Sequence, residues 1–110
     1  MILYHKDLTQ QRWNGFSTFE QMANIGSDVF RAMKWKDKGE VKSSRLALER
    51  ALELIDLTVE DPKNLKRLEE ILRVRECLVD YFAGDNIYGS TDKSWQNYFI
   101  AFNYLARKGT

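Results

Sequence analysis

Apolar residues recur every three or four positions along most of the chain, which is the spacing of one face of an α-helix. The first such stripe runs from Phe19 to Met33. It follows a capping box, in which Ser17 and Glu20 satisfy each other's free backbone amides at the start of a helix. We therefore expect the first helix to cover residues 17–38.

Three further stripes predict three more helices. The second helix is expected over residues 41–61 and ends at Asp61, because the residue before a proline is driven out of helical geometry. The third covers residues 62–83, with Pro62 in its first turn, and the fourth covers residues 92–107. Amphipathic helices joined by short connections bury their stripes most simply against one another. The expected fold class is all-α, an antiparallel up-and-down four-helix bundle.

The length of 110 residues suits one domain, and we expect an N-terminal extension over residues 1–16 and a single bundle domain over residues 17–110. The 44% hydrophobic and 30% charged contents are typical of a folded, water-soluble chain. No apolar run reaches the length of a membrane span, and no signal peptide is recognisable. A cytoplasmic protein without membrane contact is therefore expected.

Gly26 stands inside the first helix, where glycine costs about 1 kcal/mol relative to alanine. A close helix crossing at this position would explain the glycine. Ala23 and Ala51 are the small neighbours that we expect at the crossing.

Arg75 is the most informative polar residue because it lies in the apolar stripe of the third helix, between Leu72 and Val79. That stripe should face the core, and a buried guanidinium needs a carboxylate partner. Asp28, Asp56 or Asp80 could provide it. Arg75 is then a structural ion pair, a ligand-facing arginine at the end of the bundle, or an arginine with a buried stem and a solvated head.

The patterns of known catalytic centres are incomplete in this chain. Glu53 and Asp56 lie one helical turn apart, as in the magnesium site of all-helical nucleotide pyrophosphatases, but the first acidic pair of those enzymes is absent. Ribonuclease toxins of similar size need a histidine soon after a helical arginine, and no histidine follows His5. One histidine and the single cysteine, Cys77, do not make a zinc site. We assign no catalytic, metal-binding or cofactor-binding residue and expect no cofactor.

Charge is unevenly distributed although the formal net charge is only +1. Residues 31–42 are basic, beginning at Arg31, and include Trp35, which could stack on a nucleic-acid base. Residues 49–61 are acidic. Such a dipolar bundle suits self-association or a charged protein partner.

The segment after the third helix is the other candidate surface. Asp85, Asn86 and Tyr88 precede Trp95 in a polar loop of the kind that often carries function. The same residues could instead act as helix caps, with Tyr88 and Trp95 packing the loop onto the bundle.

Three segments resemble a small family of prokaryotic helical proteins without a known activity: EQMANIGSDV at residues 20–29, RVRE at residues 73–76 and GDNIYGST at residues 84–91. The resemblance implies that these segments form one shared site or interface. More distantly, the helix containing Asn24 and the Leu/Ala-rich helix after it are similar to the four-helix proteins encoded in ribosomal RNA intervening sequences. Some relatives of those proteins form rings that bind nucleic acid.

The leading hypothesis is a non-enzymatic interaction module that self-associates or docks a protein partner. The alternative is a nucleotide-binding or nucleic-acid-binding bundle, or an enzyme, that uses Arg75 with Asp28 or Asp56. The candidate interaction and ion-pair residues are Asn24, Asp28, Arg31, Trp35, Asp56, Arg75, Asp80, Asp85, Asn86, Tyr88 and Trp95.

Overall fold

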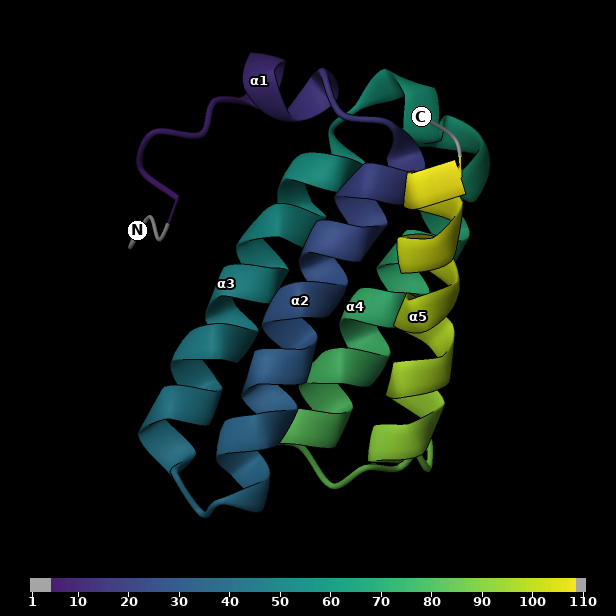
Figure 1. The fold of residues 1–110 in the computed structure, drawn as a ribbon. Coiled ribbons are helices and arrows are strands. Elements are labelled where there is room, and N and C mark those ends of the chain that lie inside the picture. The colour runs from purple at the N-terminus through teal and green to yellow at the C-terminus, as the bar shows by residue number, and fades with distance from the viewer. Residues whose placement is uncertain (1–4, 109–110) are drawn as a thin grey trace.

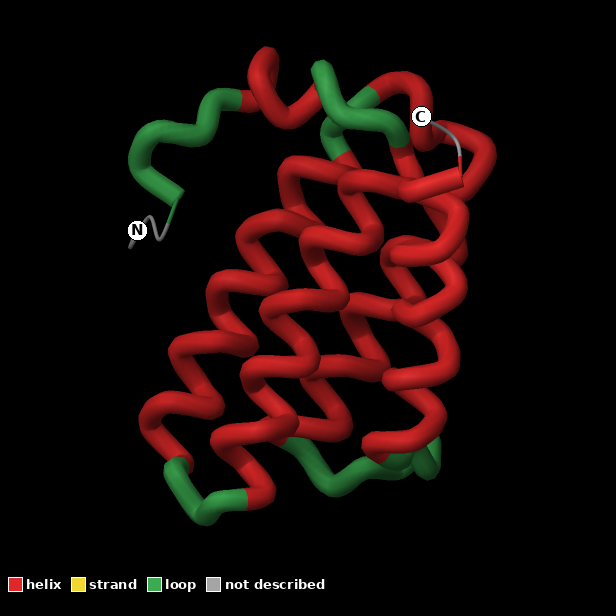
Figure 2. The backbone as a smooth tube through the Cα atoms, viewed as in Figure 1, coloured by secondary structure: helices red, strands yellow, loops and turns green. Residues whose placement is uncertain are grey.

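The structure is a computed structural model that describes residues 5–108, and over this range it is a compact helical bundle without strands (Figure 2). The all-helical fold class is confirmed. Residues 1–4 and 109–110, the two ends of the expected extension and bundle domain, lie outside the described range.

Four long helices make up the bundle: α2 (Thr18–Asp37), α3 (Val41–Val59), α4 (Leu68–Ala83) and α5 (Asp92–Lys108). Their bounds agree closely with the expected ones, and the Ser17–Glu20 capping box is formed at the start of α2. The third helix differs, because its expected first turns are a separate 3-10 helix, η1 (Pro62–Arg67).

A short helix that the apolar pattern did not predict, α1 (Gln10–Asn14), lies in the N-terminal extension. Five residues are too few to show a helical stripe. The Thr9 side chain caps this helix by accepting a hydrogen bond of 3.1 Å from the backbone amide of Arg12.

The central helix of the bundle is α2, which packs against α3 on one side and α5 on the other, while α4 packs against α3 (Figure 1). The connections at residues 38–40 and 84–91 lie at one end of the bundle, and η1 lies at the other end. The short α1 contacts α3 near the η1 end.

Because α2 has neighbours on two sides, it buries more than the one stripe that its apolar residues indicate. Met22, Val29 and Met33 are buried as expected, and Gln21 and Asp28 are buried as well. A helix with a single partner would leave these two polar side chains in solvent.

Gly26 lies at a close helix crossing, as expected, but the neighbour is different. A Cβ at Gly26 would come within 2.8 Å of the Cβ of Phe99 and 2.9 Å of its ring. The closest contact at Gly26 is therefore between α2 and α5, at Phe99 and not at the expected Ala23 or Ala51. The large Phe99 side chain, itself fully buried, fills the space that the glycine leaves.

The core-facing stripe of α4 is shifted by about one residue from the expected one. Ile71, Val74 and Leu78 are buried, whereas Leu72 is 46% exposed. The helix carries two adjacent apolar stripes, and packing against the rest of the bundle buries only one of them. The prediction that Arg75 faces the core is therefore wrong.

Fully buried polar side chains join α2, α3 and η1 at the end of the bundle near α1. Gln21 Nε2 donates to Asp61 Oδ2 at 2.8 Å and to the backbone carbonyl of Trp13 at 2.9 Å. Asn64 Nδ2 donates to Gln21 Oε1 at 2.8 Å and to the Thr58 carbonyl at 2.9 Å. We call Trp13, Gln21, Thr58, Asp61 and Asn64 the polar corner.

Two further bonds complete the polar corner. Trp13 Nε1 donates to Thr58 Oγ1 at 2.9 Å, which attaches the N-terminal segment to α3. Asp61 also caps η1 by accepting from the Lys63 amide at 3.1 Å. Burial acts to raise the pKa of Asp61, but hydrogen bonds from Lys63 and Gln21 outweigh it and hold this pKa below its usual value. The carboxylate thus stays ionised inside the fold.

Gln21→Leu tests the polar corner. Leucine keeps the size and helix propensity of the side chain but removes the partner of Asn64 and Asp61, and each buried group left unpaired costs about 1–3 kcal/mol. We expect the free energy of unfolding in urea to fall by at least that amount. Gln96→Leu, at an exposed position of α5, is the matched control and should change stability little; equal effects of the two substitutions would contradict the assigned role.

Gly26→Ala tests the close crossing. Alanine gains about 1 kcal/mol of helix propensity, but the added methyl group overlaps Phe99, and overpacking a core costs about 1–3 kcal/mol. We expect a net loss of stability in thermal or urea unfolding. A gain in stability would show that α2 and α5 separate easily, and Ser27→Ala, at the exposed neighbouring position, serves as the control.

Candidate functional site

The partner of Arg75 is Asp56, one of the three expected carboxylates. Arg75 Nε lies 2.8 Å from Asp56 Oδ1, and Arg75 Nη2 lies 3.3 Å from Oδ2, so the contact is bidentate. The Arg75 side chain is 37% exposed and that of Asp56 is 60% exposed. The pair therefore joins α3 to α4 at the surface and not in the core, and Arg75 does not line the pocket between α2, α3 and the N-terminal segment.

Asp28 forms the centre of a different charged cluster. Its Oδ1 atom lies 2.6 Å from Arg31 Nη1, one turn along α2, and 3.7 Å from Arg50 Nε of α3. Its Oδ2 atom lies 3.8 Å from His5 Nε2. The Asp28 side chain is only 7% exposed, so this carboxylate is held among cations at the edge of the core.

His5 reaches the cluster from the N-terminal segment. Glu53 of α3 accepts hydrogen bonds of 2.8 Å from both the backbone amide and, in the matching tautomer, the Nδ1 atom of His5. A carboxylate on Nδ1 orients the imidazole and leaves Nε2 directed toward Asp28. The sequence offered no signal for this contact, because His5 and Glu53 are 48 positions apart.

The cluster lines an open pocket of about 390 Å³ between α2, α3 and the N-terminal segment. Its lining combines apolar and polar side chains. The residues that line it are His5, Leu8, Trp13, Phe16, Asn24, Ser27, Asp28, Arg31, Arg50 and Leu54. Asn24, Asp28 and Arg31 were expected as candidate residues, whereas His5 and Arg50 were not.

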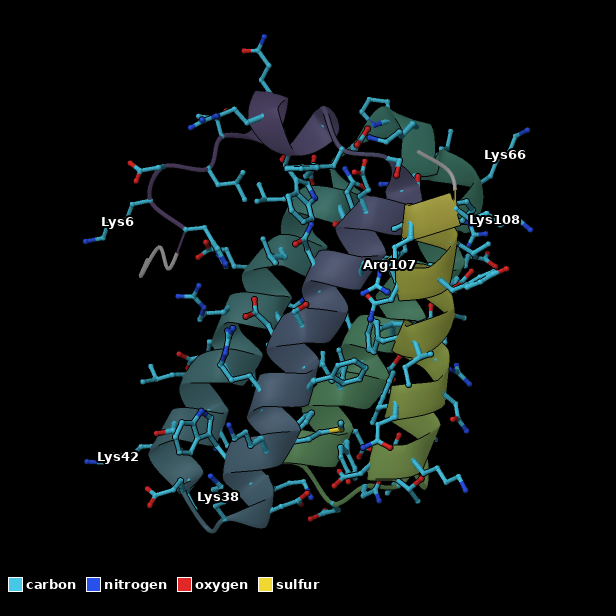
Figure 3. The ribbon with its side chains drawn as sticks, viewed as in Figure 1. Lys6, Lys38, Lys42, Lys66, Arg107 and Lys108 are labelled. Carbon is cyan, nitrogen blue, oxygen red and sulfur yellow. The ribbon has the colours of Figure 1, made fainter. Side chains whose placement is uncertain are left out.

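The other candidate residues lie near the opposite end of the bundle. Trp35 is half-buried, and the ammonium groups of Lys34 and Lys38 lie 6.0 and 5.5 Å from its ring centroid. Figure 3 shows Lys38 and Lys42 at the end of the bundle where α2 passes to α3. Lysines of the basic segment thus lie around the indole ring of Trp35 or extend into solvent.

Lys36 connects this end of α2 to the start of α5. Its Nζ atom lies 3.1 Å from Asp37 and 3.4 Å from Asp92. Burial acts to lower the pKa of Lys36, but hydrogen bonds to Asp37 and Tyr81 and the charge of Asp92 outweigh it and raise this pKa. Lys36 therefore acts as a structural cation.

The loop at residues 84–91 is held by its own polar groups. The Asp80 carboxylate accepts from the amides of Ile87 and Tyr88 at 3.0 and 3.1 Å. Asn86, at a positive φ of 54°, exchanges two hydrogen bonds with the backbone of Ser90. Asn86 thus stabilises the turn of this loop, and Asp80, which was expected as a possible partner of Arg75, binds the loop backbone instead.

Tyr88 and Trp95 play separate parts beside this loop. The Tyr88 hydroxyl donates to Glu76, and its ring lies 5.3 Å from the Arg73 guanidinium, so Tyr88 ties the loop to α4. Trp95 is buried in the core and stacks on Phe99 with ring centroids 5.9 Å apart. Asp85 lies exposed at the start of the loop.

Within residues 5–108, no group of three or more histidine, cysteine or acidic side chains is placed to hold a metal ion. No helix in that range combines the length and hydropathy of a membrane-spanning segment. Comparisons with protein-family models, with curated proteins and with solved structures found no match. The resemblances stated for the sequence therefore stay predictions.

Arg75→Met tests the environment of the surface ion pair. Because both partners are well exposed, we expect the free energy of unfolding to change by less than about 1 kcal/mol. Urea denaturation measures the change. A loss of about 3–5 kcal/mol is the effect of breaking a buried pair and would contradict the surface location.

Proposed function

We propose that the protein is a non-enzymatic interaction module that associates with a second copy of itself through one face of α4. This face, called the α4 face below, comprises Leu68, Leu72, Arg75 and Val79. The observation that carries the proposal is an apolar stripe on α4 that is left partly in solvent. Leu72 is 46% exposed, and Leu65, in the preceding η1, is 73% exposed.

The spacing of the α4 face supports helix pairing. Its residues follow one another at intervals of four, three and four positions, which is the heptad spacing of a coiled-coil seam. Leu72 and Val79 do not pack into the buried core cluster, whereas Leu52 and Val59 of α3 do. Burying such aliphatic side chains against another helix yields about 25 cal/mol per Å² of apolar area.

The ion pair beside the α4 face favours a second copy over an unrelated partner. Arg75 lies in the α4 face, and its partner Asp56 lies next to it on the neighbouring α3. A two-fold axis through such a surface brings the Arg75 of one subunit toward Asp56 of the partner subunit, and the reverse contact forms at the same time. A polar residue in an apolar seam also sets its register.

We also propose that the bundle has the antiparallel up-and-down topology expected from the sequence, with α1 and η1 added at one end. The short connection at residues 38–40 and the corner at residues 60–61 support this topology, since each leaves room only for a reversal of direction. The proposed location is the cytoplasm, on the ground that the single Cys77 has no second cysteine to pair with.

The alternative hypothesis of a ligand site built on Arg75 receives less support. Arg75 contacts Asp56 on the surface, and Asp28 contacts Arg31, Arg50 and His5 instead. Arg75 and Asp28 thus belong to separate clusters.

Self-association is tested by sedimentation equilibrium from micromolar to millimolar protein. We expect a reversible monomer–dimer equilibrium that Leu72→Lys shifts at least tenfold toward monomer, because a charged side chain is costly to bury in an apolar seam. Leu46→Lys is the matched control: Leu46 is similarly exposed, at 51%, but lies on α3 outside the α4 face. This control should dimerise like the wild type.

A wild-type chain that stays monomeric at every concentration would reject self-association. Equal weakening by Leu72→Lys and Leu46→Lys would reject the α4 face as the interface. Circular dichroism of both variants checks that each remains helical.

A further inference from the structure

We propose that the pocket between the N-terminal segment, α2 and α3 binds a small organic anion with a flat apolar body, whose anionic group is held by Arg31 and Arg50. The inference is independent of self-association, since the pocket and the α4 face share no residue. The expected ligand joins a phosphate or a carboxylate to an aromatic ring system, either directly, as in an aryl phosphate, or through a sugar, as in a mononucleotide.

The two arginines have hydrogen-bond donors to spare. A guanidinium offers five N–H donors. Among residues 5–108, Arg31 uses one of them in a side-chain bond to Asp28. Arg50 Nε is buried and has no hydrogen-bond partner within that range, since Asp28 lies 3.7 Å away. Both arginines line the same pocket, and two guanidinium groups with unused donors favour a ligand rich in acceptor oxygens.

One carboxylate lies between the two arginines, so it orients both guanidinium groups but balances the charge of only one. Asp28 presents the same Oδ1 atom to both Arg31 and Arg50, so two positive groups share one counter-ion. Asp28 is nearly fully buried, whereas the side chains of Arg31 and Arg50 are 51% and 40% exposed, so the arginine side chains are more accessible to solvent than the carboxylate. An incoming anion meets the cations first.

The remaining polar groups of the pocket do not change this ratio of one carboxylate to two guanidinium groups. Glu53 is engaged by His5, at 2.8 Å, and does not line the pocket. Ser27 Oγ donates to the Ala23 carbonyl, and Asn24 Nδ2 donates to the Glu20 carbonyl. The side-chain donors that stay available to a ligand are therefore mainly those of the two arginines.

The apolar part of the pocket lining suits a flat apolar group. It comprises Leu8, Trp13, Phe16 and Leu54, and Phe16 has 38% of its surface exposed. Trp13 and Phe16 contact each other edge to face, with ring centroids 5.6 Å apart, so the Phe16 ring is held in place for stacking. The volume of about 390 Å³ lies within the usual range for small-molecule sites.

A small molecule fits these features better than a nucleic-acid chain. The arginines and aromatic rings line one pocket of limited volume, whereas a strand-binding protein extends its positive charge along a groove. Residues 24–31 of α2 line the pocket, which therefore includes Arg31, the first residue of the basic segment. The rest of that segment, with Trp35, Lys38 and Lys42, contributes nothing to the lining of the pocket.

Titration of the full chain followed by calorimetry and by amide NMR tests the site. The probes are adenosine monophosphate, phenyl phosphate and benzoate, with adenosine, phenol and inorganic phosphate as partial ligands. We expect at least one of the three anionic probes to bind at least tenfold more tightly than its neutral counterpart and than inorganic phosphate. Phenyl phosphate against benzoate distinguishes a phosphate ligand from a carboxylate ligand.

Variants locate the binding. Arg31→Gln and Arg50→Gln should each weaken binding of the preferred probe at least tenfold, whereas Arg75→Gln, which breaks an ion pair outside the pocket, should bind like the wild type. Asn24→Phe keeps every charge of the pocket and obstructs its volume from an exposed position, so it should also weaken binding. This variant keeps the test decisive if Arg50→Gln fails to fold.

Three outcomes would overturn the proposal. The first is no binding of any anionic probe at millimolar concentration. The second is equal binding of adenosine and adenosine monophosphate, or of phenol and phenyl phosphate, because the arginines would then contribute nothing. The third is binding of single-stranded RNA without binding of any small probe, which assigns the arginines to a nucleic-acid surface.

Discussion

Asn64 donates a hydrogen bond to Gln21 inside the bundle, and the position of the whole N-terminal segment depends on the network around this bond. The polar corner joins α2 to Asp61, at the start of η1, and to the carbonyl of Trp13 in α1. Asn64 extends this network to the end of α3. Buried polar groups must find partners, and a fully satisfied set admits only one arrangement of the chains that carry them. The apolar stripes alone would allow the helices to slide or rotate, but these bonds set their register at one end.

The candidate ligand site is a consequence of that constraint. Trp13 is fixed by its bond to Thr58, and the segment before α1 then runs back along α3, where His5 contacts Glu53. Without this path, the pocket would lack the wall formed by Leu8, Trp13 and Phe16. Asp28 is buried for a related reason, since α2 lies between α3 and α5 and has little surface left for solvent. A central helix, a folded-back N-terminal segment and one shared carboxylate together hold two arginines at the mouth of a pocket.

The α4 helix shows how far pattern reasoning reaches and where it fails. Two apolar stripes, one through Ile71 and Leu78 and the other through Leu72 and Val79, differ by about 100° around the helix. Both satisfy the periodicity of an amphipathic helix, so the sequence predicts the helix without deciding which stripe is buried. Asp56, the observed partner of Arg75, was among the predicted candidates because few carboxylates lie within reach of Arg75. Its burial was predicted wrongly because the other stripe faces the core, and this error revealed the exposed seam that supports self-association.

The sequence by itself determined the number of long helices, most of their bounds, the capping of α2 at Ser17 and the turn at Asp61, because these depend on neighbours within one or two helical turns. It also required a close crossing at Gly26, although not the identity of the residue that meets it. Only the tertiary structure decided that Phe99 fills that crossing and that Asp56 pairs with Arg75 at the surface. It also decided that one pocket is lined by His5, Asp28, Arg31 and Arg50. Those contacts join residues far apart in the chain, and their geometry depends on the rotation and offset of whole helices, which local periodicity does not specify.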